Sequence, residues 1–201
     1  MPASINDMKK LTHDSLMTLE AYARAREDFR TKVMAHKKQR QVHLGEHLTL
    51  LFEDELTMQY QVQEMLRLER MFEPELIQEE LDVYNPLIPD GSNWKATMLI
   101  EYPGVAERQR KLAELGGIED KVWVQVAGHD KVYAIADEDL DRTTEEKTSA
   151  VHFMRFELTP AMITALKQDA VLSMGVDHPG YQAELAPVPD EVKASLLKDL
   201  Q

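Results

Sequence analysis

The stretch 53–91 constrains the fold most, because its apolar residues recur with helical spacing on both sides of one proline. The recurring residues are Met58, Val62, Met65, Leu66 and Phe72 before the proline, and Leu76, Ile77, Leu81 and Tyr84 after it. Spacings of three, four and seven indicate one buried face per helix. Pro74 cannot lie inside a helix but suits the first position of a new one. The sequence therefore predicts a helix capped by Thr57 that ends just before Pro74, and a second helix that stops before Pro86.

The rest of the chain predicts a mixture of strands and helices in an order typical of α+β proteins. Expected helices cover 19–40, 105–115, 160–167 and 190–200. Expected strands cover 48–52, 95–102, 149–158 and 171–178, with a hairpin over 122–136 that turns at Gly128. We expect a mostly antiparallel β-sheet with an N-terminal helical segment and helices packed on the sheet. We also expect one domain over 1–201, with a helical arm at 1–40 and an α+β body at 41–201.

Composition excludes several classes of function. A net charge of -13 argues against binding to nucleic-acid phosphates, which requires clustered Lys and Arg. The absence of cysteine excludes disulfides, thiol catalysis and an iron–sulfur cluster held by this chain's own thiolates. No secretory signal and no apolar run of transmembrane length are visible. We therefore expect a soluble cytoplasmic protein of bacterial type that does not bind nucleic acid or membranes.

Charge is distributed unevenly between the first helix and the stretch that follows it. The predicted helix 19–40 is basic, whereas the stretch 53–82 is rich in carboxylates. Two interpretations compete: the basic helix forms a patch for RNA or a membrane surface, or it is an intramolecular counterpart to the acidic helices. The acidic total and the few nearby aromatics favour the second interpretation.

The acidic helices also contain the main candidate polar site. Its residues are Glu64, Arg67, Glu69, Glu79, Glu80 and Asp82, to which we add His178. One interpretation is general acid–base chemistry or cation binding. The other, which we favour, is a solvated acidic face with one internal arginine–carboxylate bridge. Arg67 is the expected arginine, buried against Glu79 or Glu80.

The loop after these helices is a candidate recognition surface. Tyr84, Asn85, Pro86 and Pro89 lie in it, and two prolines stiffen it. The alternative is a loop buried under a sheet edge.

Histidines give only weak candidates for metal ligands. His43 and His47 flank a bend at Gly45 and are the best available pair, whereas His152 alternates with apolar residues and is predicted to be a packed histidine. No Glu-x-x-His motif, P-loop, dinucleotide-binding motif or nucleophile elbow occurs. We therefore expect no cofactor and no stoichiometric transition metal.

Several separated motifs resemble one known family. In order, these are LGEHLTLLFE, QEMLRLER, QEELDVYNPLIPDG, ATMLIEYP, VHFMRFELTP and VDHPGY. They resemble the bacterial family known only as domain of unknown function 3501, over nearly the whole chain. That family has no assigned activity or catalytic residues. Its members are often encoded beside rubrerythrin-like and iron–sulfur proteins, so the resemblance implies an accessory role in redox or peroxide stress.

Three functions from different classes follow as hypotheses. The first is a non-catalytic accessory or binding protein that serves an iron–sulfur or rubrerythrin-type partner. The second is a carboxylate- or metal-dependent enzyme that acts on a small molecule. The third is an RNA-associated protein that uses the basic helix.

Overall fold

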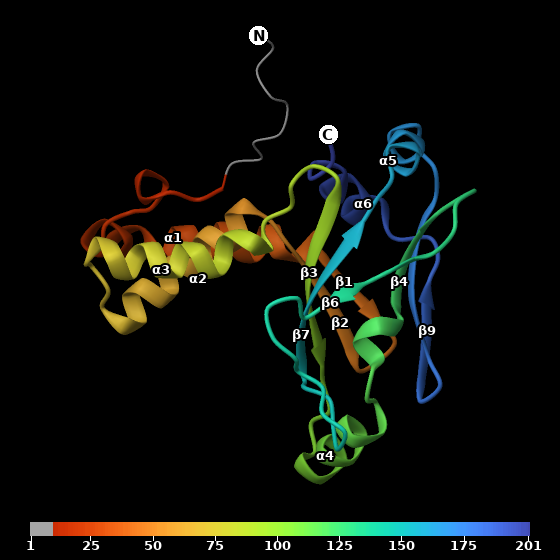
Figure 1. The fold of residues 1–201 in the computed structure, drawn as a ribbon. Coiled ribbons are helices and arrows are strands. Elements are labelled where there is room, and N and C mark those ends of the chain that lie inside the picture. Colours follow the sequence, from red (N-terminus) through yellow and green to blue (C-terminus); the bar gives the residue numbers. More distant parts are fainter. Residues whose placement is uncertain (1–9) are drawn as a thin grey trace.

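The computed structural model describes residues 10–201 and contains helices and strands in the mixed order expected of an α+β protein (Figure 1). The α-helices are α1 (Leu19–Lys38), α2 (Glu55–Glu69), α3 (Pro74–Tyr84), α4 (Val105–Glu114), α5 (Pro160–Lys167) and α6 (Asp190–Leu197). Short 3-10 helices are η1 (His13–Ser15), η2 (Asn85–Leu87) and η3 (Ile118–Lys121). The strands are β1 (Gln41–Leu44), β2 (Leu48–Glu53), β3 (Asn93–Ile100), β4 (Val122–Val126), β5 (Val132–Tyr133), β6 (Ile135–Ala136), β7 (Val151–Glu157), β8 (Leu172–His178) and β9 (Tyr181–Leu185).

Two antiparallel sheets form the body of the molecule. One has the order β1-β2-β3-β7-β6 and the other has the order β5-β4-β8-β9. The chain changes sheet at Ala134, because β5 pairs with β4 whereas β6 pairs with β7. The α+β fold with mostly antiparallel strands is therefore confirmed.

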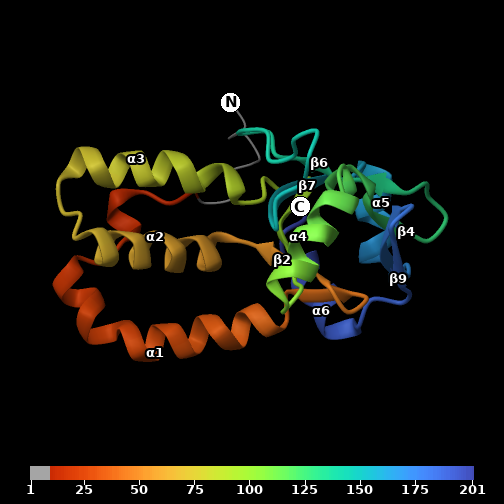
Figure 2. The same ribbon diagram turned by 90° about the horizontal axis from the view of Figure 1, so that it is seen from below.

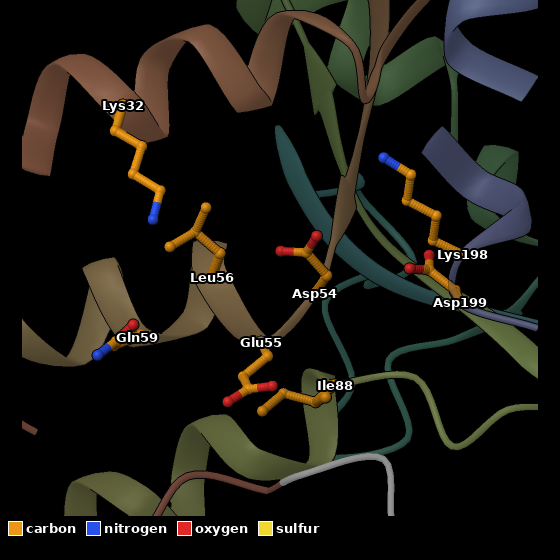
Figure 3. Close-up of a pocket in the computed structure, with 8 residues that line it drawn as sticks. All are labelled: Lys32, Asp54, Glu55, Leu56, Gln59, Ile88, Lys198 and Asp199. Carbon is orange, nitrogen blue, oxygen red and sulfur yellow. The ribbon is translucent and has the colours of Figure 1, made fainter. Parts of the chain in front are cut away.

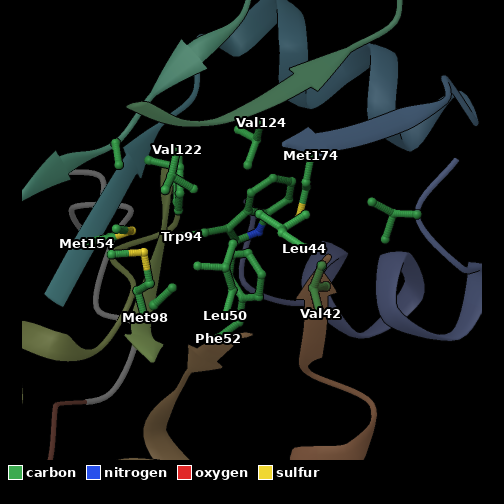
Figure 4. Close-up of a cluster of buried hydrophobic side chains, with 14 of the residues drawn as sticks. Val42, Leu44, Leu50, Phe52, Trp94, Met98, Val122, Val124, Met154 and Met174 are labelled. Atoms are coloured by element: carbon green, nitrogen blue, oxygen red, sulfur yellow. The ribbon is translucent and has the colours of Figure 1, made fainter. Parts of the chain in front are cut away.

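The main hydrophobic core lies between the inner faces of the two sheets (Figure 4). In β3 the buried and half-buried residues alternate, as expected when one face of a strand packs on a core. Trp94 is fully buried, and its Nε1 donates to the Leu196 carbonyl over 3.0 Å, which connects β3 to α6. Burial of the large side chains on both inner faces is the main force that holds the sheets together.

Three helices form a second layer to one side of the sheets. Figure 2 shows α1, α2 and α3 lying side by side and extending away from the strands. They enclose a separate cluster made of Leu11, Met58, Val62, Leu66, Leu81 and Ile88. This layer therefore uses residues on both sides of the expected boundary at 40 and 41. That the whole chain forms a single domain stays a prediction.

Local structure in α2 differs from the expectation in two places. The N-cap is Asp54 and not Thr57: the Asp54 carboxylate accepts from the Thr57 N–H over 3.0 Å, and the Thr57 hydroxyl accepts from the Asp54 N–H over 2.9 Å. Gln63 lies outside the expected apolar stripe but is fully buried, and its amide forms two hydrogen bonds with the main chain of Met17. Helical spacing identified the buried face but could not show that another segment covers the next face as well.

The expected final strand 171–178 is followed by one more strand. The chain turns after His178, and β9 pairs with β8 through the whole of its length. Pro179 and Gly180 favoured an end to the strand, but they form the turn of a hairpin.

Candidate functional site

The candidate acidic residues of α2 and α3 do not assemble into a single site. Glu64 pairs with α1: Arg26 donates to its carboxylate from Nε over 2.7 Å and from Nη2 over 2.9 Å, and the Tyr22 hydroxyl donates over 2.6 Å. The Arg26 guanidinium holds the pKa of Glu64 down at about 2, and burial raises the pKa of Tyr22. This carboxylate is a fixed structural link between two helices.

The position of Arg67 contradicts our expectation that this residue forms a buried ion pair with Glu79 or Glu80. Its side chain is exposed, and within residues 10–201 it forms no salt bridge with Glu79 or Glu80. Arg67 lies on a side of α2 that faces solvent. The internal arginine–carboxylate bridge exists, with Arg26 of α1 as the donor.

Replacing Arg67 with alanine is expected to change the free energy of unfolding by no more than about 0.5 kcal/mol, because an exposed side chain without a partner is lost. Tyr22→Phe should cost about 1 to 3 kcal/mol, since it removes a buried donor from Glu64. Urea denaturation of both variants beside the wild type measures the difference. A cost for Arg67→Ala as large as that for Tyr22→Phe would contradict the structure.

The acids of α3 lie on an open face. Glu75, Glu79 and Asp82 line a depression of about 400 Å³ together with Pro74 and Gln78. Partial burial, followed by the charges of Glu69 and Glu79, raises the pKa of Glu80. The open position of these acids agrees with the solvated acidic face that we favoured over a site for acid–base chemistry or cation binding.

The histidine candidates have separate partners. His178 lies in β8, where the Gly116 carbonyl is 3.0 Å from Nε2 and the Gly180 N–H donates to Nδ1 over 3.0 Å. His43 and His47 do not share a ligand position, because His43 Nδ1 lies 3.1 Å from the Thr49 hydroxyl whereas His47 stacks on Tyr102. His43 lies in β1 and His47 in the turn that joins β1 to β2.

The loop 84–89 holds another part of the chain in place. The Asn85 side chain accepts from the Leu11 N–H over 2.8 Å and donates to the Leu11 carbonyl over 3.0 Å. Ile88 and Pro89 are buried, Tyr84 is half-buried and Pro86 is exposed. The loop is therefore mainly internal, so its substitution would disturb folding and could not test recognition cleanly.

The basic helix α1 has several intramolecular partners. Besides the Arg26–Glu64 pair, His36 Nε2 lies 2.5 Å from the Asp54 carboxylate, and Lys37 Nζ lies 5.5 Å from the centre of the Tyr60 ring. These contacts favour the interpretation of α1 as a counterpart to the acidic helix α2.

A cleft lies where the helical layer meets the sheets, and sequence reasoning missed it (Figure 3). Its volume is about 420 Å³, and its lining residues are Lys32, Asp54, Glu55, Leu56, Gln59, Ile88, Lys198 and Asp199. Lys32 comes from α1 and Lys198 from the end of α6, and neither has a salt-bridge partner within residues 10–201. The lining combines two such lysines with three carboxylates, an arrangement suited to a small polar or charged ligand.

A buried guanidinium organises the carboxylates of this cleft. Arg40 donates from Nη2 to Asp199, and its Nε lies 3.4 Å from Asp54. Arg40 also connects β2 to α6, because it donates to the Phe52 carbonyl over 2.9 Å and to the Ser195 carbonyl over 3.2 Å. Burial, which outweighs the attraction of Arg40, raises the pKa of Asp199 to about 6. One carboxyl of the cleft therefore titrates near neutral pH.

Exposed apolar side chains gather at the turn between α2 and α3. Leu68 is 68% exposed, Phe72 is 70% exposed and Leu76 is 38% exposed. We call these three residues the tip patch. Phe72 was expected in the buried stripe, but Arg70 ends α2 in the left-handed conformation and the chain turns before reaching the next helical position. Figure 2 shows this turn at the end of the helical layer that is farthest from the sheets.

The fold and these sites define an acidic α+β protein with a projecting helical layer, a mixed-charge cleft and no standard catalytic motif. The chain belongs to the family of proteins of unknown function DUF3501, whose model matches residues 10–200. This confirms the family indicated by the sequence motifs.

A solved structure is similar over almost the full length. It is the crystal structure of a novel protein of unknown function from Burkholderia pseudomallei K96243, with 55% sequence identity and a TM-score of 0.91. The alignment covers 96% of this chain and 100% of that one. The search of curated proteins found no match.

Proposed function

We propose that this protein is a non-catalytic accessory protein that acts by binding a partner protein through the tip patch. The observation that carries the proposal is the exposure of Phe72, at 70%, on a helical turn that projects from the body. A large aromatic side chain in water has a free-energy cost that burial in a partner recovers, and such residues often dominate binding energies. Exposed apolar side chains that gather in one place are typical of interaction surfaces.

The surroundings of the patch indicate the chemistry of its partner. The exposed charged residues within and beside it are Glu69, Glu73, Glu75, Arg67 and Arg70, so acids outnumber bases there. The whole chain has a net charge of -13, so a second copy of the same acidic tip would be repelled. The complementary surface is an apolar depression with a basic rim. In agreement with the family resemblance, we propose an iron–sulfur or rubrerythrin-type protein as the partner and the cytoplasm as the location. In residues 10–201, no helix has the length and apolar character needed to cross a membrane.

Phe72→Ser and Leu68→Ser should each weaken binding to the partner by about tenfold or more, because each removes apolar contact area at the centre of the interface. The binding partners are a purified rubrerythrin-type protein and a purified iron–sulfur protein of the same organism, tested one at a time by calorimetry. Val171→Ser serves as the matched control, since Val171 is 50% exposed but lies next to β8 in the sheets.

Three results would contradict the proposal. The first is an absence of binding by the wild type to either protein. The second is unchanged binding by both tip variants. The third is a wild-type chain that sediments as a dimer while Phe72→Ser sediments as a monomer, because the tip would then bind another copy of this chain. Circular dichroism of each variant verifies that the fold is retained.

The cleft supports a second candidate function, a carboxylate-dependent enzyme that acts on a small molecule. The observation in its favour is the Asp199 carboxyl, whose pKa of about 6 suits proton transfer near neutral pH. The lining contains no serine, threonine or histidine, so Asp54 and Glu55 are the carboxylates that could act as a second base. A small anionic molecule that binds the wild type, but not a Lys32→Gln, Lys198→Gln double variant, would favour this alternative.

A further inference from the structure

A buried cluster that the proposed function does not use lies between η3 and the end strands of the first sheet. It consists of Glu119 in η3, Asp137 directly after β6 and His152 in β7. His152 is 0% exposed and Glu119 is 7% exposed, and the Asp137 side chain is 8% exposed. Three segments that are separate in the sequence therefore place two carboxylates and an imidazole together away from water.

The distances match a set of metal ligands. One ligand atom from each of the three residues lies within 4.8 Å of the other two. Coordination bonds from carboxylate oxygen or imidazole nitrogen are about 2.0 to 2.2 Å long, so one ion can contact all three atoms after small side-chain shifts. No comparable group of three histidine or acidic residues occurs elsewhere in residues 10–201.

Hydrogen bonds orient His152 as a ligand. The Thr148 hydroxyl oxygen lies 2.8 Å and the Ser149 carbonyl oxygen 3.0 Å from Nε2. Because a carbonyl can only accept, the Ser149 contact places a proton on that nitrogen. This leaves the Nδ1 lone pair directed at the Asp137 Oδ2 atom, which is 2.6 Å away. A separation of 2.6 Å is that of two atoms sharing a proton, and a metal ion that replaces this proton requires the two atoms to move to about 3 Å apart. Metal-binding histidines typically donate their second N–H to a backbone carbonyl in this way.

Both carboxylates are also held by neighbouring groups. Asp137 uses its other oxygen, Oδ1, to accept from the Phe153 N–H over 3.1 Å and from Arg142 Nη1 over 3.0 Å, so Oδ2 stays directed at His152. The Thr143 hydroxyl donates to Glu119 Oε1, and the Thr148 hydroxyl lies 3.3 Å from Oε2. Such fixed orientation is characteristic of preformed ligand sites.

The cluster carries more negative than positive charge. Arg142 is the cation in contact with Asp137, but it also binds Asp139 over 2.6 Å. Glu119 has no cationic partner within residues 10–201 and is bound only by the two threonine hydroxyls. Because an unbalanced charge away from water is costly, a cation at this place would stabilise the folded chain.

We propose that Glu119, Asp137 and His152 form a binding site for one divalent first-row transition metal ion. A donor set of one nitrogen and two or more oxygens without thiolate fits Zn²⁺, Mn²⁺ or Fe²⁺. The sequence-based expectation of no metal depended on the absence of a histidine near the carboxylates. Folding supplies that histidine from β7, so the basis of the expectation no longer holds. The proposal is independent of the partner-binding function.

Untagged protein, stripped of metal and titrated separately with Zn²⁺ and Mn²⁺ in a calorimeter, is expected to bind about one ion per chain. Fe²⁺ is tested under anaerobic conditions. Glu119→Gln and Asp137→Asn should each weaken binding by at least about tenfold, because each replaces an anionic ligand by a neutral group of the same shape. Metal should raise the melting temperature of the wild type and leave that of both variants unchanged.

Asp139→Asn is the matched control, because Asp139 contacts the same Arg142 but is 54% exposed and lies outside the ligand set. It should bind metal like the wild type. Wild-type protein that binds none of the three ions would overturn the proposal and identify the cluster as a proton-sharing structural triad. Equal affinities in the wild type, Glu119→Gln and Asp137→Asn would also overturn it.

Discussion

Replacing Arg40 with alanine is expected to destabilise the protein by about 3 to 5 kcal/mol, the cost typical of breaking a buried ion pair. The Arg40 side chain is 2% exposed and contacts two carboxylates, Asp54 and Asp199. It also satisfies the Phe52 and Ser195 carbonyls. Its loss leaves the buried Asp199 without its cationic partner and removes the only side chain shown to bond both β2 and α6 within residues 10–201.

Urea denaturation with the wild type and Arg40→Ala measures this cost. Arg24→Ala is the control, since the Arg24 side chain is 78% exposed in its pair with Glu20, and exposed pairs contribute at most about 1 kcal/mol. A double variant, Arg40→Ala with Asp199→Asn, should recover part of the loss, because the stranded carboxylate is gone. A cost for Arg40→Ala as small as that for Arg24→Ala would mean that Arg40 does not hold the two parts together.

Helical periodicity predicted much of this fold because it reflects local physics. The helix α3 begins at Pro74 as expected, since proline suits the first position of a helix. The helix α2 ends at Glu69, earlier than expected, because Arg70 adopts the left-handed conformation. The hairpin at Gly128 was also expected, and β4 pairs with β5 across it. These features depend on residues that are close together in the sequence, so one sequence is enough to predict them.

Side-chain partners could not be predicted in the same way. Arg67 and Arg26 are both arginines on helices next to acidic residues, but only Arg26 faces Glu64. Which of them is paired depends on how α1 packs against α2, and no residue pattern encodes that rotation. Phe72 illustrates the same limit, because the left-handed residue Arg70 changes the direction of the chain two positions earlier.

Both polar sites consist of residues that are distant in sequence. The cleft joins Lys32 to Asp199, and the buried cluster joins Glu119 to His152. Asp137 belongs to a charged segment that resembles an ordinary solvated loop. The alternation around His152 correctly predicted a packed histidine, but only the pairing of β6 with β7 brings a carboxylate to it. The available signal was a buried polar residue in a strand, which indicates a partner without identifying it.

Wild-type protein is expected to lose about 2 kcal/mol of stability relative to Asp199→Asn as the pH rises from about 4 to about 7, since one pKa unit corresponds to about 1.4 kcal/mol. Burial raises the pKa of Asp199 from 3.8 in the unfolded chain to about 6 in the folded protein. Between these values the folded state holds a proton that the unfolded state has released. The contribution is therefore complete below pH 3.8 and disappears as the pH passes through 6.

Charged groups around Asp199 decide how large this effect is. Arg40 attracts the ionised form and lowers the pKa, as does His36 of α1, whereas Asp54 at the start of α2 raises it. Urea midpoints of the wild type and Asp199→Asn at several pH values isolate this carboxyl, because all other groups titrate in both proteins. If stability relative to Asp199→Asn instead rises between pH 4 and pH 7, attraction by Arg40 exceeds the cost of burial, and the pKa of Asp199 is not raised in the folded protein.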